Sequence, residues 1–160
     1  MPLKILFIGD VVGSPGRKIV GQVLPRLVRR WGIGLVVCNA ENAAGGSGLT
    51  VKCHEELVDA GVDVFTMGDH VYRKDEIFGL FERTDRIVRP VNFPADAPGE
   101  EVALAQARDG TTVAVFTVLG RTYMRPVDCP FRAADRVLEG ISAVVKVTVL
   151  RETRSVEFAR

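Results

Sequence analysis

The sequence predicts an α/β fold, with a parallel βαβαβα arrangement in its first half and β-hairpins in its second half. Three apolar runs in the first half alternate with segments of helical periodicity, and they span residues 3–8, 35–38 and 62–67. Short apolar runs of this kind are typical of buried parallel strands. Strands that alternate with helices favour a parallel sheet with right-handed crossovers. Because 47% of the 160 residues are hydrophobic, we expect a single folded domain over residues 1–160.

Capping residues and glycines mark the helices between these strands. Ser14 and Pro15 are expected at the N-cap and the first position of the first helix, and Pro25 is expected to kink or divide it. Thr50 is expected to cap the second helix, which ends at Gly61. A third helix is expected over residues 74–82, with inward-facing side chains at Ile77, Phe78 and Phe81.

The second half of the chain has a different pattern. Residues 87–90 form a short predicted strand that ends at a proline. Asp109-Gly110 separates two strand-like segments, residues 102–107 and 112–119, and this is a strong signal for a hairpin. The remaining expected elements are a helix over residues 131–138 and a terminal hairpin of residues 142–150 and 155–158.

The charge balance argues against a general affinity for polyanions. The chain has 21 basic and 20 acidic residues, which gives a net charge of +1. We therefore expect no general attraction to nucleic acid or to an anionic membrane surface. Arg26, Arg29 and Arg30 cluster near the predicted end of the first helix, and we interpret them as a solvated helix face.

The cysteines and the hydropathy pattern indicate a reducing compartment. Cys38, Cys53 and Cys129 are widely spaced and form no CxxC pair, so neither a disulfide framework nor a zinc ribbon is expected. No signal peptide is recognised before the first strand, and no apolar run reaches membrane-spanning length. The expected location is the cytoplasm.

A polar motif follows each of the three apolar runs: Gly9-Asp10, Asn39-Ala40-Glu41-Asn42 and Gly68-Asp69-His70. In an open α/β sheet, ligands bind outside the carboxyl ends of the strands. We therefore expect Asp10, Glu41, Asn42, Asp69 and His70 around one crevice. Oxygen donors beside a histidine indicate a hard divalent metal and hydrolytic chemistry, with His70 as a proton donor. The alternative for each motif alone is structural: a helix-capping aspartate, a turn asparagine and a loop histidine.

Other polar residues are weaker candidates. Arg17, Arg89 and Arg121 could contact phosphate, because guanidinium groups match phosphate oxygens, although ordinary ion pairs are an equally good interpretation. Asn92 is a further candidate for substrate binding at the crevice. His54 lies within the second predicted helix, where we expect it on the surface or in helix packing.

The glycines that follow the first strand also suggest a dinucleotide site. However, Gly9, Gly13 and Gly16 do not match the GxGxxG spacing, and Pro15 occupies the turn. Metal binding is therefore the preferred interpretation of this segment.

Taken together, these motifs resemble those of the YmdB-like metallophosphoesterases. The resemblance covers essentially residues 3–138 in order. The segments that carry it are residues 6–17, 39–49, 66–70, 88–94, 119–123 and 128–131.

This resemblance implies a calcineurin-like αββα sandwich with a dinuclear metal site, which often holds iron or manganese. It implies phosphodiesterase activity on cyclic nucleotides such as 2′,3′-cAMP, by attack of a metal-activated water. By resemblance, Asp10 would bind the first metal with the help of Asn42, and Glu41 would bridge both metals. Asp69 stands where the family usually has an asparagine ligand to the second metal. His70 matches the general acid.

Two departures from the family pattern change these expectations. Asp69 keeps an oxygen ligand but adds a negative charge. After Glu139-Gly140 the chain passes directly to its terminal strands, without the family's D-F-H-A-E-A and G-T-H-T-H blocks. Those blocks supply three histidine ligands, whereas this chain contains only His54 and His70. The resemblance therefore implies an internally shortened sandwich with an incomplete dinuclear site.

These departures lead to three further expectations. The reduced ligand set favours manganese or magnesium. The alternative to an enzyme is a catalytically degenerate module that binds a metal, a nucleotide or a partner. A shortened sandwich would also expose sheet surface, so a homo-oligomer is expected.

Overall fold

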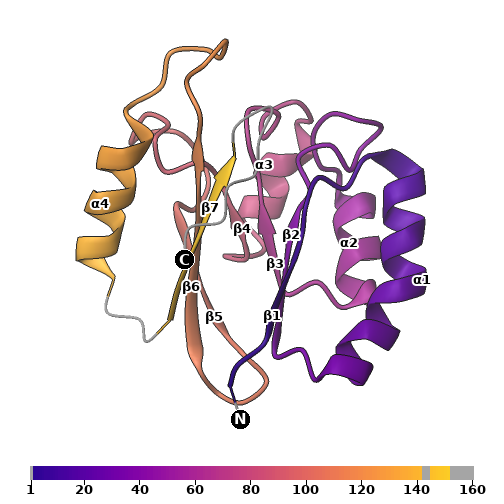
Figure 1. Cartoon of the computed structure of the whole chain (residues 1–160). Helices are drawn as coiled ribbons and strands as arrows, with labels where there is room; N and C mark the ends of the chain where they lie inside the picture. The colour runs from indigo at the N-terminus through magenta and orange to yellow at the C-terminus, as the bar shows by residue number, and fades with distance from the viewer. Residues whose placement is uncertain (1, 142–144, 152–160) are drawn as a thin grey trace.

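A computed structural model describes residues 2–141 together with the backbone of residues 145–151, and it shows two β-sheets packed between layers of helices (Figure 1). The four strands of the first sheet are parallel and lie in the order β1-β2-β3-β4. This confirms the predicted βαβαβα arrangement. The elements of this half are β1 (Ile5–Ile8), α1 (Gly13–Trp31), β2 (Leu35–Asn39), α2 (Val51–Ala60), β3 (Val64–Thr66), α3 (Glu76–Phe81) and β4 (Ile87–Val88).

The second sheet has the order β5-β6-β7 among the described residues. The predicted hairpin at Asp109-Gly110 is confirmed, since β5 (Val102–Gln106) and β6 (Thr112–Leu119) pair antiparallel. The chain then passes through α4 (Pro130–Gly140) to β7 (Val145–Arg151), which pairs parallel to β6. The strand expected over residues 142–150 thus joins β6 by a helical crossover. Its expected hairpin partner, residues 155–158, lies outside the described residues.

Alternating side chains bury both faces of the first sheet. Val36 and Cys38 on β2 point to the core beneath α1 and α2, whereas Leu35 and Val37 point to the second sheet. On β6, Val113 and Val115 contribute to the core between the sheets. Phe116 and Val118 of β6 belong to a third cluster, in which they pack with residues of α4. The result is the four-layer αββα sandwich that the resemblance implied (Figure 1).

The start of α1 differs from the prediction. The helix begins at Gly13, with Val12 at the N-cap and no side-chain cap, so Ser14 is not the N-cap. The amide of Gly13 donates instead to the backbone carbonyl of Asn42 at 3.0 Å, which replaces a side-chain cap. The helix also continues undivided through Pro25 to Trp31.

The caps and faces of the next two helices are partly as predicted. Thr50 caps α2, because its hydroxyl accepts a hydrogen bond from the amide of Cys53 at 3.3 Å. In α3 the prediction for Phe78 was wrong: Ile77 and Leu80 are buried, while Phe78 is 43% exposed and its ring stacks on that of Tyr72. Residues three apart share one face of a short helix, and the intervening residue is rotated away from the core.

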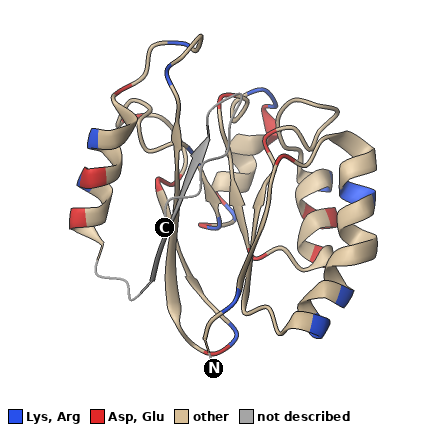
Figure 2. Cartoon of the chain, viewed as in Figure 1, with Lys and Arg blue, Asp and Glu red and all other residues tan. Residues whose placement is uncertain are grey.

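The surface carries both signs of charge, and the basic positions at the C-terminal end of α1 are exposed as predicted (Figure 2). All three cysteines are free thiols, as expected. Within the described part of the chain, none of the helices combines the length and the apolar content that a membrane span requires.

Candidate functional site

The loops that follow the strands of the first sheet are held together by backbone hydrogen bonds. The amide of Val11 donates to the carbonyl of Asn39 at 3.1 Å, and the amide of Ala40 donates to the carbonyl of Thr66 at 3.1 Å. These bonds join the ends of β1, β2 and β3 along one edge of the sheet. The polar motifs after the three strands are therefore brought to one place, as the sequence predicts.

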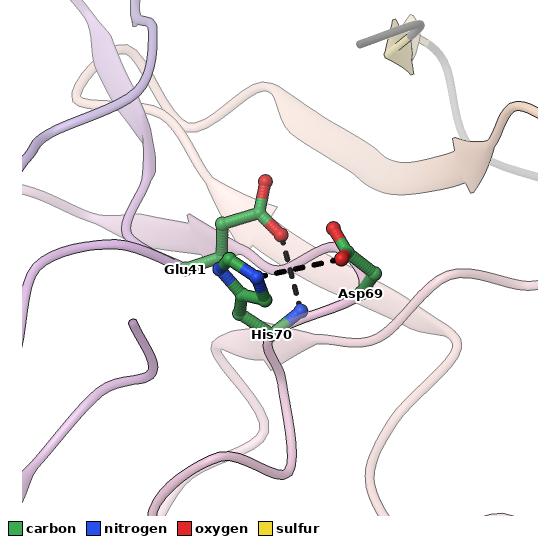
Figure 3. A group of neighbouring side chains, drawn as sticks. All are labelled: Glu41, Asp69 and His70. Atoms are coloured by element: carbon green, nitrogen blue, oxygen red, sulfur yellow. Dashed lines mark hydrogen bonds and ion pairs between the residues drawn. The ribbon is translucent and has the colours of Figure 1, made fainter. Parts of the chain in front are cut away.

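Glu41, Asp69 and His70 form one compact group of side chains. Their ligand atoms all lie within 4.8 Å of one another. The amide of His70 donates to Oε2 of Glu41 at 3.4 Å, and Nε2 of His70 lies 3.5 Å from Oδ2 of Asp69. Figure 3 shows the three side chains directed toward a common space. Glu41 is only 1% exposed, whereas Asp69 lies at the surface.

Gly68 provides the space for the Glu41 carboxylate. A Cβ atom at Gly68 would overlap this carboxylate and would lie 2.7 Å from its Cδ. Real Cβ atoms do not approach a neighbour so closely, so only glycine allows the backbone after β3 to lie against Glu41. The glycine before Asp69 thus leaves room for the carboxylate of Glu41, which lies in the loop after β2.

Asn42 joins Asp10 to His70. Its Nδ2 donates to Oδ1 of Asp10 at 2.7 Å, and its Oδ1 lies 2.6 Å from Nδ1 of His70. An ionised carboxylate only accepts hydrogen bonds, so the amide nitrogen of Asn42 must face Asp10. The Oδ1 atom then faces His70, whose Nδ1 must be the donor. Nε2 of His70 is consequently the ring nitrogen that faces Asp69.

Asp10 occupies an unusual backbone conformation at the end of β1. Its φ angle is +36°, in the left-handed region that residues with a Cβ rarely adopt. Backbone strain of this kind clusters at functional sites, where surrounding contacts maintain it. Asp10 is exposed and reaches the group of Glu41, Asp69 and His70 through Asn42.

This set of residues fits a divalent cation. The ligand atoms of two carboxylates and an imidazole all lie within 4.8 Å of one another, and a glycine keeps space for the buried carboxylate. Carboxylate donors are typical of magnesium and manganese sites, whereas imidazole nitrogen is a ligand that suits zinc and iron. Three of the predicted site residues thus form the group itself, while Asp10 and Asn42 are connected to it by hydrogen bonds.

Arg17 is engaged elsewhere in the structure. Its Nε donates to Oε2 of Glu56 at 2.6 Å, and its Nη1 donates to the carbonyl of Ala43 at 2.5 Å. The hydrogen bond from Arg17 holds the pKa of the Glu56 carboxyl below its usual value. The side chain therefore ties α1 to α2 and to the loop after β2.

Asn92 and Arg89 are buried and hold loops in place. Nδ2 of Asn92 donates to the carbonyls of Leu119 and Asp128, while its Oδ1 accepts from the amide of Leu119. Arg89 is 2% exposed, and its guanidinium donates to Glu101 and to the carbonyls of Pro90, Ala97 and Gly99. The structure does not bring Arg89 to the crevice.

A cavity of about 560 Å³ adjoins the group, and Asp69 forms part of its wall. Its other walls come from the loops after β3 and β4 and from the segment after β6. The exposed Arg121 lies in this last segment but does not line the cavity. The sequence did not predict this cavity, although residues 119–123, which resemble a segment of the family, contribute to its wall.

The fold and the group together define the class of protein. An αββα sandwich that carries carboxylates and a histidine at the strand ends of its parallel sheet is a metallophosphoesterase fold. The chain belongs to the family described as YmdB-like protein, because the sequence model of that family matches residues 6–153.

Individual relatives agree with this assignment. The chain is 43% identical over 136 residues to a protein of Bacillus subtilis (strain 168) named 2′,3′-cyclic-nucleotide 2′-phosphodiesterase, and the match covers 85% of this chain and 51% of that protein. A crystal structure of a hypothetical protein from Thermus thermophilus matches 91% of this chain and 56% of its own, with a TM-score of 0.85 and 38% identity.

A crystal structure described as a novel phosphatase, from Mycoplasma pneumoniae, matches 92% of this chain and 54% of its own. Its TM-score is 0.83 and its identity is 26%. The chain thus spans about half the length of each of these three relatives.

Proposed function

We propose that this chain is a divalent-metal-dependent phosphoesterase that hydrolyses phosphodiester bonds in cyclic nucleotides such as 2′,3′-cAMP. The observation that carries the proposal is the convergence of Glu41, Asp69 and His70 within 4.8 Å at the strand ends of the first sheet. The name of the Bacillus subtilis relative supports the substrate class.

In this proposal Asp10, Glu41, Asn42 and Asp69 hold the metal, which we expect to be manganese or magnesium. A divalent cation at this position would orient a phosphate oxygen and lower the pKa of a water molecule. The water would release one proton to solvent and its oxygen would attack phosphorus, while the bond from phosphorus to one ribose oxygen breaks. In its doubly protonated form, His70 would keep its Nδ1 proton on the hydrogen bond to Asn42 and would donate its Nε2 proton to that leaving oxygen.

The charge of Asp69 has two opposite effects in this site. Its carboxylate strengthens the attraction for a metal cation relative to the asparagine usual in the family. The same charge faces the negatively charged phosphate and weakens the attraction for substrate. We therefore expect tight metal binding together with a raised KM.

The test is hydrolysis of bis-p-nitrophenyl phosphate and of 2′,3′-cAMP with added manganese. The wild-type chain is compared with Asp10→Ala and His70→Ala, and with Asp135→Ala on the exposed surface of α4 as a control. Loss of a proton donor or of a metal ligand should lower kcat by about 100-fold or more, whereas the control should retain activity. Equal background rates of hydrolysis for all four proteins would refute the proposed phosphoesterase activity.

A second candidate function is binding of a metal or a nucleotide without turnover. The histidine content favours it, since the chain has two histidines and His54 packs against Phe65 at a ring-centroid distance of 4.6 Å, outside the group. Saturable manganese binding in calorimetry, lost in Glu41→Gln and unaccompanied by hydrolysis, would select this function over the first.

A further inference from the structure

The cavity beside Asp69 has one rigid aromatic wall. The rings of Tyr72 and Phe93 lie with centroids 6.1 Å apart and tilted by 44°. The Tyr72 hydroxyl donates to the carbonyl of Pro98 at 2.7 Å, and both rings also pack against the core beneath the first sheet. These contacts hold the wall in place before any ligand arrives, which limits the ordering cost of binding.

A second part of the cavity wall is a loop with both ends clamped. The buried side chain of Asn92 binds the backbone of Leu119 and of Asp128, at 2.8 Å and 3.0 Å from Nδ2. Residues 120–127 therefore project from one fixed base over the cavity. Asn92, a predicted site residue, is a positioning residue for this loop.

Tyr123 is unusual among the residues of this loop in its exposure and its backbone conformation. It lines the cavity, its side chain is fully exposed, and its φ angle is +58°. A bulky residue in the left-handed region is a genuine outlier, and an aromatic ring that contacts no core gains nothing for folding. Such a ring, held beside a concave apolar surface, is suited to stacking on a flat ligand.

We propose that this cavity binds the base of the nucleotide substrate, with Tyr123 stacking on the base opposite Phe93; this inference rests on the proposed function. Asp69 lines the cavity and also belongs to the group of Glu41, Asp69 and His70. A phosphate ester whose phosphate lies at this group would therefore direct its organic part into the cavity. The cationic Arg73 and Arg125 also line the cavity and complement the negative charge of a nucleotide. A volume of about 560 Å³ lies within the range of small-ligand sites.

The experiment uses 2-aminopurine riboside 3′-monophosphate, whose fluorescence is quenched when its base stacks on an aromatic ring. The wild-type chain should quench it saturably. Tyr123→Ala should raise the Kd by about tenfold and reduce the quenching, whereas Tyr123→Phe should behave as the wild type. Phe131→Ala is the matched control, because Phe131 is 71% exposed and lies outside the cavity.

The results separate this inference from the proposed function. Absence of quenching by the wild type, or equal Kd values for wild type and Tyr123→Ala, would overturn the base subsite. Ribose 5-phosphate, which lacks a base, should bind the wild type and Tyr123→Ala equally in calorimetry. If quenching depends on Tyr123 but hydrolysis is unaffected by Asp10→Ala, the base subsite is supported and the proposed phosphoesterase function is refuted.

Discussion

At the scale of single residues, the site depends on one buried carboxylate. Glu41 is 1% exposed, and its oxygens face the backbone of Gly68 and the amide of His70. A buried charge is costly unless hydrogen bonds, a partner or a cation compensate it. The position of Glu41 thus links the fold of three loops to the proposed metal site.

Gly68→Ala tests this link. The added methyl group would overlap the Glu41 carboxylate, so we expect destabilisation of about 1–3 kcal/mol and weaker manganese binding. Thermal unfolding and calorimetric titration measure the two effects. The control is Gly79→Ala in α3, where a Cβ atom meets nothing within 4 Å. Manganese affinity that is unchanged in Gly68→Ala would contradict the role given to Glu41.

The thiols of Cys38 and Cys129 should differ strongly in reactivity. Burial raises the pKa of the Cys38 thiol to about 12. Backbone amides of Arg132 and Phe131 at the start of α4 lower the pKa of Cys129, which is partly exposed. We expect iodoacetamide at pH 7.5 to alkylate Cys129 first, as measured by peptide mass spectrometry. Cys129→Ser should abolish the fast phase, and early modification of Cys38 would be inconsistent with the structure.

At the scale of elements, some helix boundaries are set by local sequence signals and others by tertiary contacts. The cap of α2 is local, because the Thr50 hydroxyl reaches an amide three residues later, and the sequence predicts it. The start of α1 is capped by the carbonyl of Asn42, which belongs to another βα unit. No spacing within the first 20 residues could have shown this contact.

The stability of α2 on the sheet should depend on pH through His54. Burial lowers the pKa of His54 below its usual value of 6.5, opposed by the charge of Glu55. Well above pH 6.5 the imidazole is neutral in both the folded and unfolded states. Below pH 6.5 the unfolded state binds the proton first, so the free energy of unfolding decreases until the pH passes the lower folded-state pKa.

Urea unfolding between pH 7.5 and pH 5 measures this effect. The wild type should lose stability as the pH falls below 6.5. His54→Gln, which carries no titrating ring, should show a flatter dependence over the same interval. Identical slopes for the two proteins would assign the pH dependence to other groups.

At the scale of the whole molecule, the two sheets bury a common core between them. Among the described residues, β1 pairs with β2 alone, so within that part of the chain the other edge of β1 presents backbone donors and acceptors. We expect a second copy of the chain to cover exposed sheet, which gives a dimer in sedimentation velocity at micromolar concentration. A single monomeric species over a hundredfold range of concentration would contradict this expectation.

The sequence by itself determined the parallel sheet, the hairpin and the motifs at the strand ends. These features are local: apolar periodicity, a two-residue turn and the alternation of strands with helices specify them without distant contacts. The same alternation places Asp10, Glu41 and His70 at one edge of the sheet, because the carboxyl ends of parallel strands lie together.

Only the tertiary structure decided how the individual side chains are used. It placed Asn92 as the clamp of a loop and showed that Arg17 and Arg89 hold the backbone in place. It also formed the cavity beside Asp69 from three separate loops. The role of each side chain depends on which hydrogen-bond donors and acceptors lie close together across the layers of the sandwich. Residues far apart in the sequence contain no local pattern that predicts these contacts.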